Sequence, residues 1–110
     1  MRVLLQTIFP TEPFNELVKS GKIGAIMQRI MEDVKPEAVY FTEQDGKRSG
    51  LFVINLASPS DIPKVAEPFF LTFNAECHLK VAMSPEDLRA AGLEALGKKM
   101  AERKTALLSK

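Results

Sequence analysis

Glu76 and His78 are the two residues of this sequence whose types and spacing best suit chemistry. They stand two positions apart in a segment, residues 76–83, that alternates between apolar and polar side chains as a strand with one buried face does. Side chains two apart in a strand point to the same side. Because a carboxylate can hold and orient an imidazole, the pair is predicted to serve as a general base.

A ligand site is predicted around this pair. Lys80 shares its face by alternation, and other polar groups are expected on the same side of the sheet. The predicted ligand-binding residues are Gln6, Tyr40, Thr42, Asn55 and Lys80. Polar groups in a partly apolar wall are typical of small-molecule pockets. The alternative is that these groups meet solvent or a partner chain at the edge of a sheet.

A metal site is not expected. Glu76 and His78 supply two ligands, and Cys77 between them points to the other side of the strand. A catalytic zinc ion usually takes about three protein ligands, so a partner chain would have to contribute one. No cofactor is predicted either, because the sequence has no glycine-rich phosphate loop of standard spacing.

A β-hairpin is the clearest structural element. The stretch AVYFTEQDGKRSGLFVINLA, residues 38–57, places two β-rich runs around Asp45-Gly46, a dipeptide suited to a type I′ turn. A two-residue loop places Glu43 opposite Arg48, predicting a cross-strand ion pair, and Tyr40 opposite Leu51. One face of the hairpin is then apolar. The other is semi-polar, as a pocket or an interface would be.

The remaining elements follow from periodicity and from turn and cap residues. Pro68 is predicted to end the third helix, and the aromatic segment 69–73 to connect it to the next strand. The expected order is a strand at 2–9, a helix capped by Thr11 and broken at Ser20-Gly21, a helix at 22–34, the hairpin, a short helix from Ser60 or Asp61, a strand at 76–83, and a helix from Ser84-Pro85 that Gly92 and Gly97 weaken.

This β-α-β-β-α-β order predicts one ferredoxin-like α+β domain spanning residues 1–110, with an extra C-terminal helix. Its product is a four-stranded antiparallel sheet with helices on one face. The other face would carry Leu51 and Val53, and an open apolar sheet face of that size is unfavourable in water. A second copy of the chain, the C-terminal helix or a ligand are the candidates to cover it.

Three segments, PEAVYFTEQDGKRSG, SPSDIPKVAEPFF and VAMSPEDL, together with the element order, resemble an uncharacterised bacterial family of the dimeric α+β barrel superfamily. Muconolactone isomerase and the antibiotic-biosynthesis monooxygenases are better-known relatives with the same layout. The resemblance covers nearly the whole chain and implies a homodimer with two sheets face to face. It carries no active-site pattern over position by position, because one scaffold hosts unrelated chemistries.

Composition narrows the partners. The formal net charge of +1 provides no strong field for nucleic acid or an anionic membrane. No apolar run approaches the ~20 residues of a membrane span, and the start, MRVLLQTIFP, lacks the features of a signal peptide. With a single cysteine, a cytoplasmic protein is expected. The RNA-recognition motif shares the element order, but Gly50 and Asn55 stand where its stacking aromatics would be needed.

Three functions therefore remain open. The first is a small homodimeric protein that binds a small, partly apolar molecule on the helix-free sheet face. The second is an isomerase or cofactor-free monooxygenase on the same scaffold, with His78 or Glu76 as the base. The third is a structural or interaction protein whose sheet face serves only to dimerise. An enclosed cavity beside His78 would favour the first two.

Overall fold

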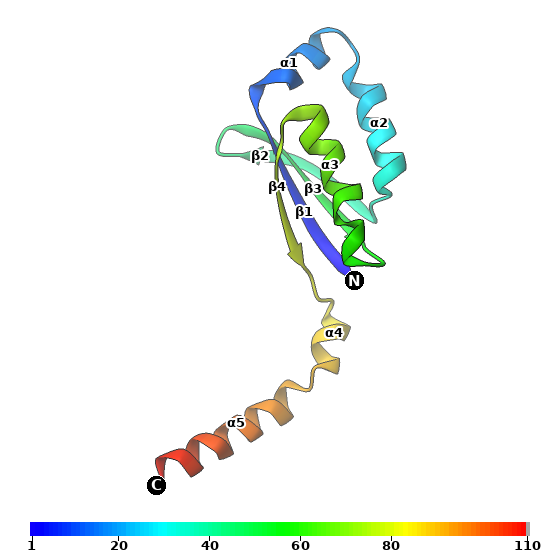
Figure 1. Cartoon of the computed structure of the whole chain (residues 1–110). Helices are drawn as coiled ribbons and strands as arrows, with labels where there is room; N and C mark the ends of the chain where they lie inside the picture. The colour runs from blue at the N-terminus through cyan, green and yellow to red at the C-terminus, as the bar shows by residue number, and fades with distance from the viewer. Residues whose placement is uncertain (110) are drawn as a thin grey trace.

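The chain folds into a four-stranded antiparallel sheet with helices on one face and a helical arm that leaves the end of the sheet (Figure 1). A computed structural model describes residues 1–109. The elements are β1 (Arg2–Phe9), α1 (Thr11–Lys19), α2 (Ile23–Val34), β2 (Ala38–Gln44), β3 (Lys47–Asn55), the 3₁₀ turn η1 (Pro59–Asp61), α3 (Ile62–Phe73), β4 (Glu76–Val81), α4 (Pro85–Ala90) and α5 (Leu93–Leu108). The strand order is β2-β3-β1-β4 with every neighbour antiparallel. The predicted ferredoxin-like α+β fold is confirmed.

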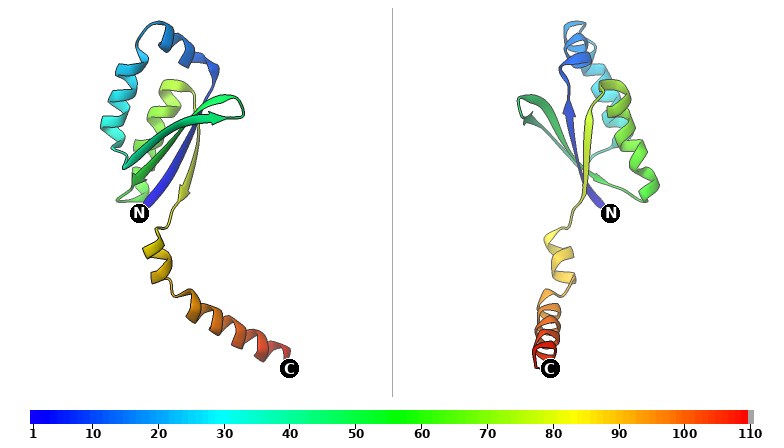
Figure 2. Two further views of the ribbon diagram at one scale, coloured as in Figure 1. Left: turned by 180° about the vertical axis from the view of Figure 1, so that it is seen from behind. Right: turned by 60° about the vertical axis from the view of Figure 1, so that its left-hand side comes forward.

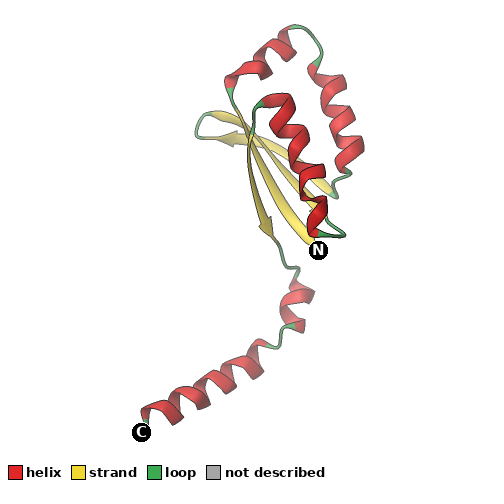
Figure 3. Ribbon diagram, viewed as in Figure 1, coloured by secondary structure: helices red, strands yellow, loops and turns green. Residues whose placement is uncertain are grey.

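The core lies between the sheet and the helices α1, α2 and α3 (Figure 3). Strand β1 shows why: its odd-numbered residues, such as Val3 and Leu5, are fully buried against the helices, while Leu4 on the other side is 43% exposed. Aromatic rings fill the centre, with the Phe52 and Phe69 centroids 4.8 Å apart. Such contacts contribute beyond simple area burial. The alternation divides the sheet into a helix-covered face and a helix-free face.

The central hairpin has the predicted register. Asp45 and Gly46 both have positive φ, 52° and 80°, as a type I′ turn requires. Tyr40 pairs with Leu51 along the ladder. A one-residue slip would have moved one strand's side chains to the opposite face, so this turn fixes which hairpin residues face the helices.

The predicted ion pair between Glu43 and Arg48 does not form, although the two residues face each other in the ladder. Both project to the helix-covered side, where α1 supplies better partners for the arginine. Its guanidinium lies 4.5 Å from the Phe14 ring centroid and donates to Asn15 Oδ1 at 2.7 Å. The carboxylate of Glu43 instead accepts the Gly46 N–H at 2.9 Å, inside the turn.

Helix α3 is longer than predicted. It passes through Pro68, which was expected to end it, and includes the aromatic segment that was expected to be a connection. Proline removes one helical hydrogen bond, but Val65, Phe69 and Phe73 are buried on both sides of it. Burial of these side chains outweighs the lost bond. Its last residue is Phe73, five residues after Pro68, and Asn74 caps it in the left-handed conformation.

The first helix begins differently from the prediction as well. Thr11 does not cap it. The N-cap position is Pro10, which makes no side-chain hydrogen bond to the helix, and Glu12 has non-helical backbone angles. The carboxylate of Glu12 accepts the backbone N–H of Glu16 at 3.2 Å instead, satisfying one of the free donors of the first turn. The predicted break at Ser20-Gly21 is confirmed, with Gly21 at a φ of 75°.

The C-terminal helix is split at Gly92, whose φ of 69° interrupts it between α4 and α5. The two pieces form an arm that extends from the end of β4 and does not lie across the sheet (Figures 1 and 2). The chain therefore measures 70 × 28 × 22 Å and has a radius of gyration of 20.1 Å, against about 13 Å for a compact chain of this length. No helix within residues 1–109 is both long and apolar enough to cross a membrane.

Candidate functional site

The helix-free face is formed by the side chains of all four strands that alternate away from the core. Gln6 pairs with His78, and Ile8 pairs with Glu76, across the β1–β4 ladder. Leu51 lies opposite Gln6 on the other side, in β3. The polar end of this face therefore lies over β1 and β4, beside an apolar strip formed by Leu4 and Leu51, which are 43% and 39% exposed.

Glu76 and His78 form a direct contact on this face. Nε2 of His78 lies 2.7 Å from Oε2 of Glu76, within the range of a strong charge-assisted hydrogen bond. The strand positions them, because alternation along β4 sends both side chains to the same side. The side chains are 50% and 64% exposed, so the imidazole is accessible to a molecule arriving from solvent. Such a pair is chemically suited to accept or donate a proton.

The pair lines a hollow of about 290 Å³. Its wall is formed by Gln6, Ile8, Gln44, Asp45, Glu76, His78 and Lys80. Of the sequence-predicted site residues, the structure brings together Gln6, Lys80 and the Glu76–His78 pair. Six of the seven lining residues carry polar side chains, so the hollow is a hydrogen-bonding site with one apolar wall.

The tip of the β2–β3 hairpin forms the far wall of the hollow. Strand β2, which carries Gln44, lies at the opposite edge of the sheet from β4, which carries Glu76 and His78. Gln44 nevertheless reaches past β3 to β1, where its Oε1 accepts a hydrogen bond from Gln6 Nε2 at 3.2 Å. The contact is possible because the hairpin bends away from the helical layer and over the helix-free side (Figure 2). Gln44 in turn donates to Asp45 Oδ2 at 3.3 Å, which ties the turn to the same wall.

Three of the predicted ligand-binding residues lie elsewhere. Tyr40 and Thr42 are on the helix-free side of β2, but they do not line the hollow, and the tyrosine is 65% exposed. Asn55 lies at the opposite end of β3, where its Oδ1 accepts a hydrogen bond from the N-terminal ammonium group of Met1 at 3.0 Å. Its role in the structure is to hold the start of β1.

Ile8, Gln44 and Asp45 line the hollow but were not predicted to do so. Alternation carried a signal for two of them: Ile8 shares a face with Gln6, and Gln44 shares a face with Thr42. Nothing local in the sequence indicated that the hairpin would bend far enough to bring Asp45 over β4. That bend depends on the twist of the whole sheet.

Cys77 points to the opposite side of β4 and is not part of the site. Its thiol packs towards α3, with Sγ 4.0 Å from the backbone oxygen of Ala66. Burial, together with the nearby charge of Glu67, raises the pKa of the Cys77 thiol to about 11. A thiol with so high a pKa is a poor nucleophile at neutral pH. No three His, Cys, Asp or Glu side chains within residues 1–109 come together as metal ligands.

The strand order and the single helical layer define a ferredoxin-like α+β protein. Comparisons with protein-family models and with curated proteins find no match. Among solved structures, the chain is similar to the de novo designed protein Ferredog-Diesel. The two share 14% sequence identity at a TM-score of 0.44, over 74% of this chain and 85% of the designed one.

Proposed function

We propose that this protein binds a small, partly apolar molecule in the hollow on its helix-free face, as a homodimer of the dimeric α+β barrel type. One observation carries the proposal. The Glu76–His78 pair, with its 2.7 Å contact, faces a hollow of about 290 Å³ whose far wall is the bent hairpin tip. Small-molecule sites combine apolar walls with a few polar groups that fix the orientation of the ligand; in this hollow the polar groups predominate.

The homodimer is supported by the apolar part of the same face. Leu4 and Leu51 are exposed there, and the C-terminal helix, one of the candidates to cover them, extends away from the sheet (Figure 1). A second copy related by a twofold axis would bring the same surface against itself, as is usual for small homo-oligomers. The hollow would then be closed between two sheets.

The lining residues favour one class of ligand. Lys80 can bind an anionic group such as a carboxylate, although the carboxylates of Asp45 and Glu76 in the same lining oppose a negative charge near them. The amides of Gln6 and Gln44 and the imidazole of His78 favour a hydroxyl or carbonyl group. Ile8, with Leu4 and Leu51 beside the hollow, favours an apolar body between them. A small aromatic or aliphatic acid with a second polar group combines these features.

A catalytic role is the second candidate, and the contact between Glu76 and His78 favours it. A carboxylate bound to Nε2 leaves Nδ1 of the imidazole available to accept a proton from a ligand. The reaction would be a proton abstraction, as in an isomerase or a cofactor-free monooxygenase. A structural protein that only dimerises is the remaining alternative, and the binding experiment below distinguishes it.

The proposal is tested with 4-hydroxybenzoate, which combines an apolar ring, a carboxylate and a hydroxyl group. Titration of ¹⁵N-labelled protein, followed by amide chemical shifts, should locate binding at residues of the hollow. His78→Ala should weaken binding about tenfold or more, the equivalent of one hydrogen bond to a charged group. Thr42→Ala is the matched control, since Thr42 lies on the same sheet side outside the hollow; its affinity should be unchanged.

Two results would overturn the proposal. One is a set of shifts scattered over the surface with none at Gln6, Gln44 or His78. The other is equal affinity of wild type and folded His78→Ala. Either result would leave a sheet face that serves only for association.

A further inference from the structure

The C-terminal arm, residues 84–108, is the part of the structure that the hollow does not explain. It begins with a capped turn, in which Ser84 and Asp87 bond to each other's backbone N–H groups at 3.1 and 2.9 Å. The bend at Gly92 then separates α4 from α5. Every side chain of α5 is exposed, so this helix is not packed against any other element within residues 1–109.

An apolar stripe runs along one side of α5. Leu93, Leu96 and Met100 follow each other at intervals of three and four residues, which places them on one side of an α-helix. Leu107 returns to this side seven residues later, and Arg103 and Lys104 occupy the turn between it and Met100. The exposed fractions of the apolar residues range from 49% to 75%. Thr105 lies on the opposite side of the helix. A stripe of this kind is the contact surface of a helix that packs against protein.

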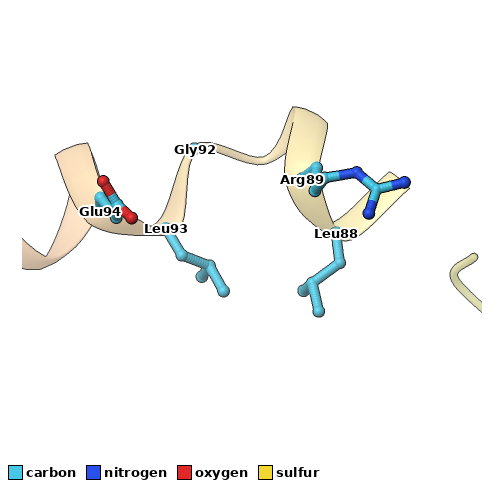
Figure 4. Close-up of a pocket in the computed structure, with 5 residues that line it drawn as sticks. All are labelled: Leu88, Arg89, Gly92, Leu93 and Glu94. Atoms are coloured by element: carbon cyan, nitrogen blue, oxygen red, sulfur yellow. The ribbon is translucent and has the colours of Figure 1, made fainter. Parts of the chain in front are cut away.

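The stripe continues across the bend into α4. Figure 4 shows the side chains of Leu88 and Leu93 pointing to the same side of the arm, with Gly92 between them. Together with Arg89 and Glu94, they line a notch of about 400 Å³. Leu88 is 44% exposed and Leu93 is 56% exposed, so the notch presents an apolar floor to whatever packs on the arm.

An arm of this composition is not expected to be a stable helix by itself. Isolated helices shorter than about 12–15 residues are marginal in water, and α5 is only slightly longer, at 16 residues. It also contains Gly97, which disfavours a helix interior. Packing of the apolar stripe therefore has to stabilise it.

The chain exposes more area than a compact monomer of its mass. The chain exposes 7898 Å², whereas a compact monomer of 12.2 kDa exposes about 6,100 Å². The excess is roughly 1,800 Å² per chain, about twice the ~800 Å² that each partner buries in an interface of standard size. The arm contributes to it, because every side chain of α5 is exposed.

We infer that the arm packs on a second copy of this chain, so that each protomer of the dimer is held by the other's arm. The inference rests on the homodimer of the proposed function. Two observations favour a second copy of the chain as the partner of the arm. The excess area matches a large, obligate type of homodimer interface, and the arm starts at the end of β4, which borders the face proposed to meet the second copy.

Photo-crosslinking tests the contact directly. Benzoylphenylalanine in place of Leu107 should link two chains on irradiation and give a band at twice the chain mass on a denaturing gel. The same probe in place of Thr105, on the opposite side of α5, is the matched control and should give far less of this band. Equal yields of the dimer band from the two probe positions, or crosslinks confined to one chain, would overturn the inference.

Association of the full-length chain gives the second measurement. Wild type should sediment as a dimer at micromolar concentration. Met100→Glu places a charge in the stripe and should weaken the dimer about tenfold or more, whereas Thr105→Glu adds the same charge on the opposite side and should not. Circular dichroism confirms that each variant retains the sheet domain.

The outcomes separate this inference from the proposed function. If Leu51→Glu weakens the dimer and Met100→Glu does not, the sheet faces meet but the arm inference is wrong. A monomeric wild type would overturn both the arm contact and the dimer, while binding of 4-hydroxybenzoate would still be measurable. Binding of wild type, but not Met100→Glu, to vesicles of phosphatidylglycerol with unchanged dimer affinity would assign the arm to a membrane surface instead.

Discussion

Gly50 in β3 occupies a position where a single added carbon should have a measurable cost. An ideal Cβ placed on it would lie 2.7 Å from Cε2 of the Phe52 ring and 2.9 Å from Oγ1 of Thr7. Both neighbours are fully buried, so neither can move aside into solvent. Gly50→Ala therefore has to displace the core under the strand that links the hairpin tip to the rest of the sheet.

The magnitude follows from two opposing effects. Overpacking a well-filled core costs about 1–3 kcal/mol. Replacing glycine by alanine recovers about 0.5–1 kcal/mol, because the unfolded chain loses conformational freedom. With each effect at the middle of its range, we expect a net loss of about 1 kcal/mol in the free energy of unfolding. For a domain of this size, the melting temperature should fall by about 4–8 °C.

Urea unfolding at one fixed protein concentration measures the change, since association makes stability depend on concentration. Gly24→Ala is the matched control. It makes the same chemical change in α2, where an added Cβ meets nothing within 4 Å, and helix propensity should leave stability unchanged or raise it by up to about 1 kcal/mol. Equal stability of Gly50→Ala and wild type would refute the packing argument.

Two further predictions concern titratable groups. Because burial raises the pKa of the Cys77 thiol to about 11, iodoacetamide at pH 8.5 should alkylate the folded protein at least ~10-fold more slowly than free cysteine, whose pKa is about 8.5; equal rates would contradict this burial. The backbone N–H of Ser84 holds the pKa of Asp87 below its usual value, so the cap stabilises α4 above about pH 4 and is lost as the pH falls through that lowered pKa. The Ser84 amide signal should follow this transition, and Asp87→Asn should abolish it.

The features that could be predicted from sequence are those that neighbouring residues determine. Asp45-Gly46 sets the hairpin register because a two-residue turn leaves no freedom in the pairing of the strands that follow it. Alternation along residues 76–81 places Glu76 and His78 together, because a strand offers only two faces. From these local rules, the hairpin register and the Glu76–His78 side of the hollow follow.

The features that could not be predicted depend on contacts distant in sequence. Gln44 reaches Gln6 only because the whole sheet twists and the hairpin bends over it. Pro68 is tolerated inside α3 because Phe69 and Phe73 are buried in the core. Arg48 turns from Glu43 to the Phe14 ring because α1 happens to lie over that end of the sheet. In each case the energy of tertiary packing exceeds a local preference.

The proposed ligand and the proposed dimer are linked by the physics of the His78–Glu76 contact. With both side chains at least half exposed, water competes for their charges and the pair contributes about 0–1 kcal/mol. A second copy over the hollow would lower the local dielectric constant and strengthen the attraction. It would also leave Lys80 and the amide oxygen of Gln6 out of water, at a cost of about 1–3 kcal/mol for each unsatisfied group. A bound polar molecule removes that cost, so closure of the dimer and occupancy of the hollow favour each other.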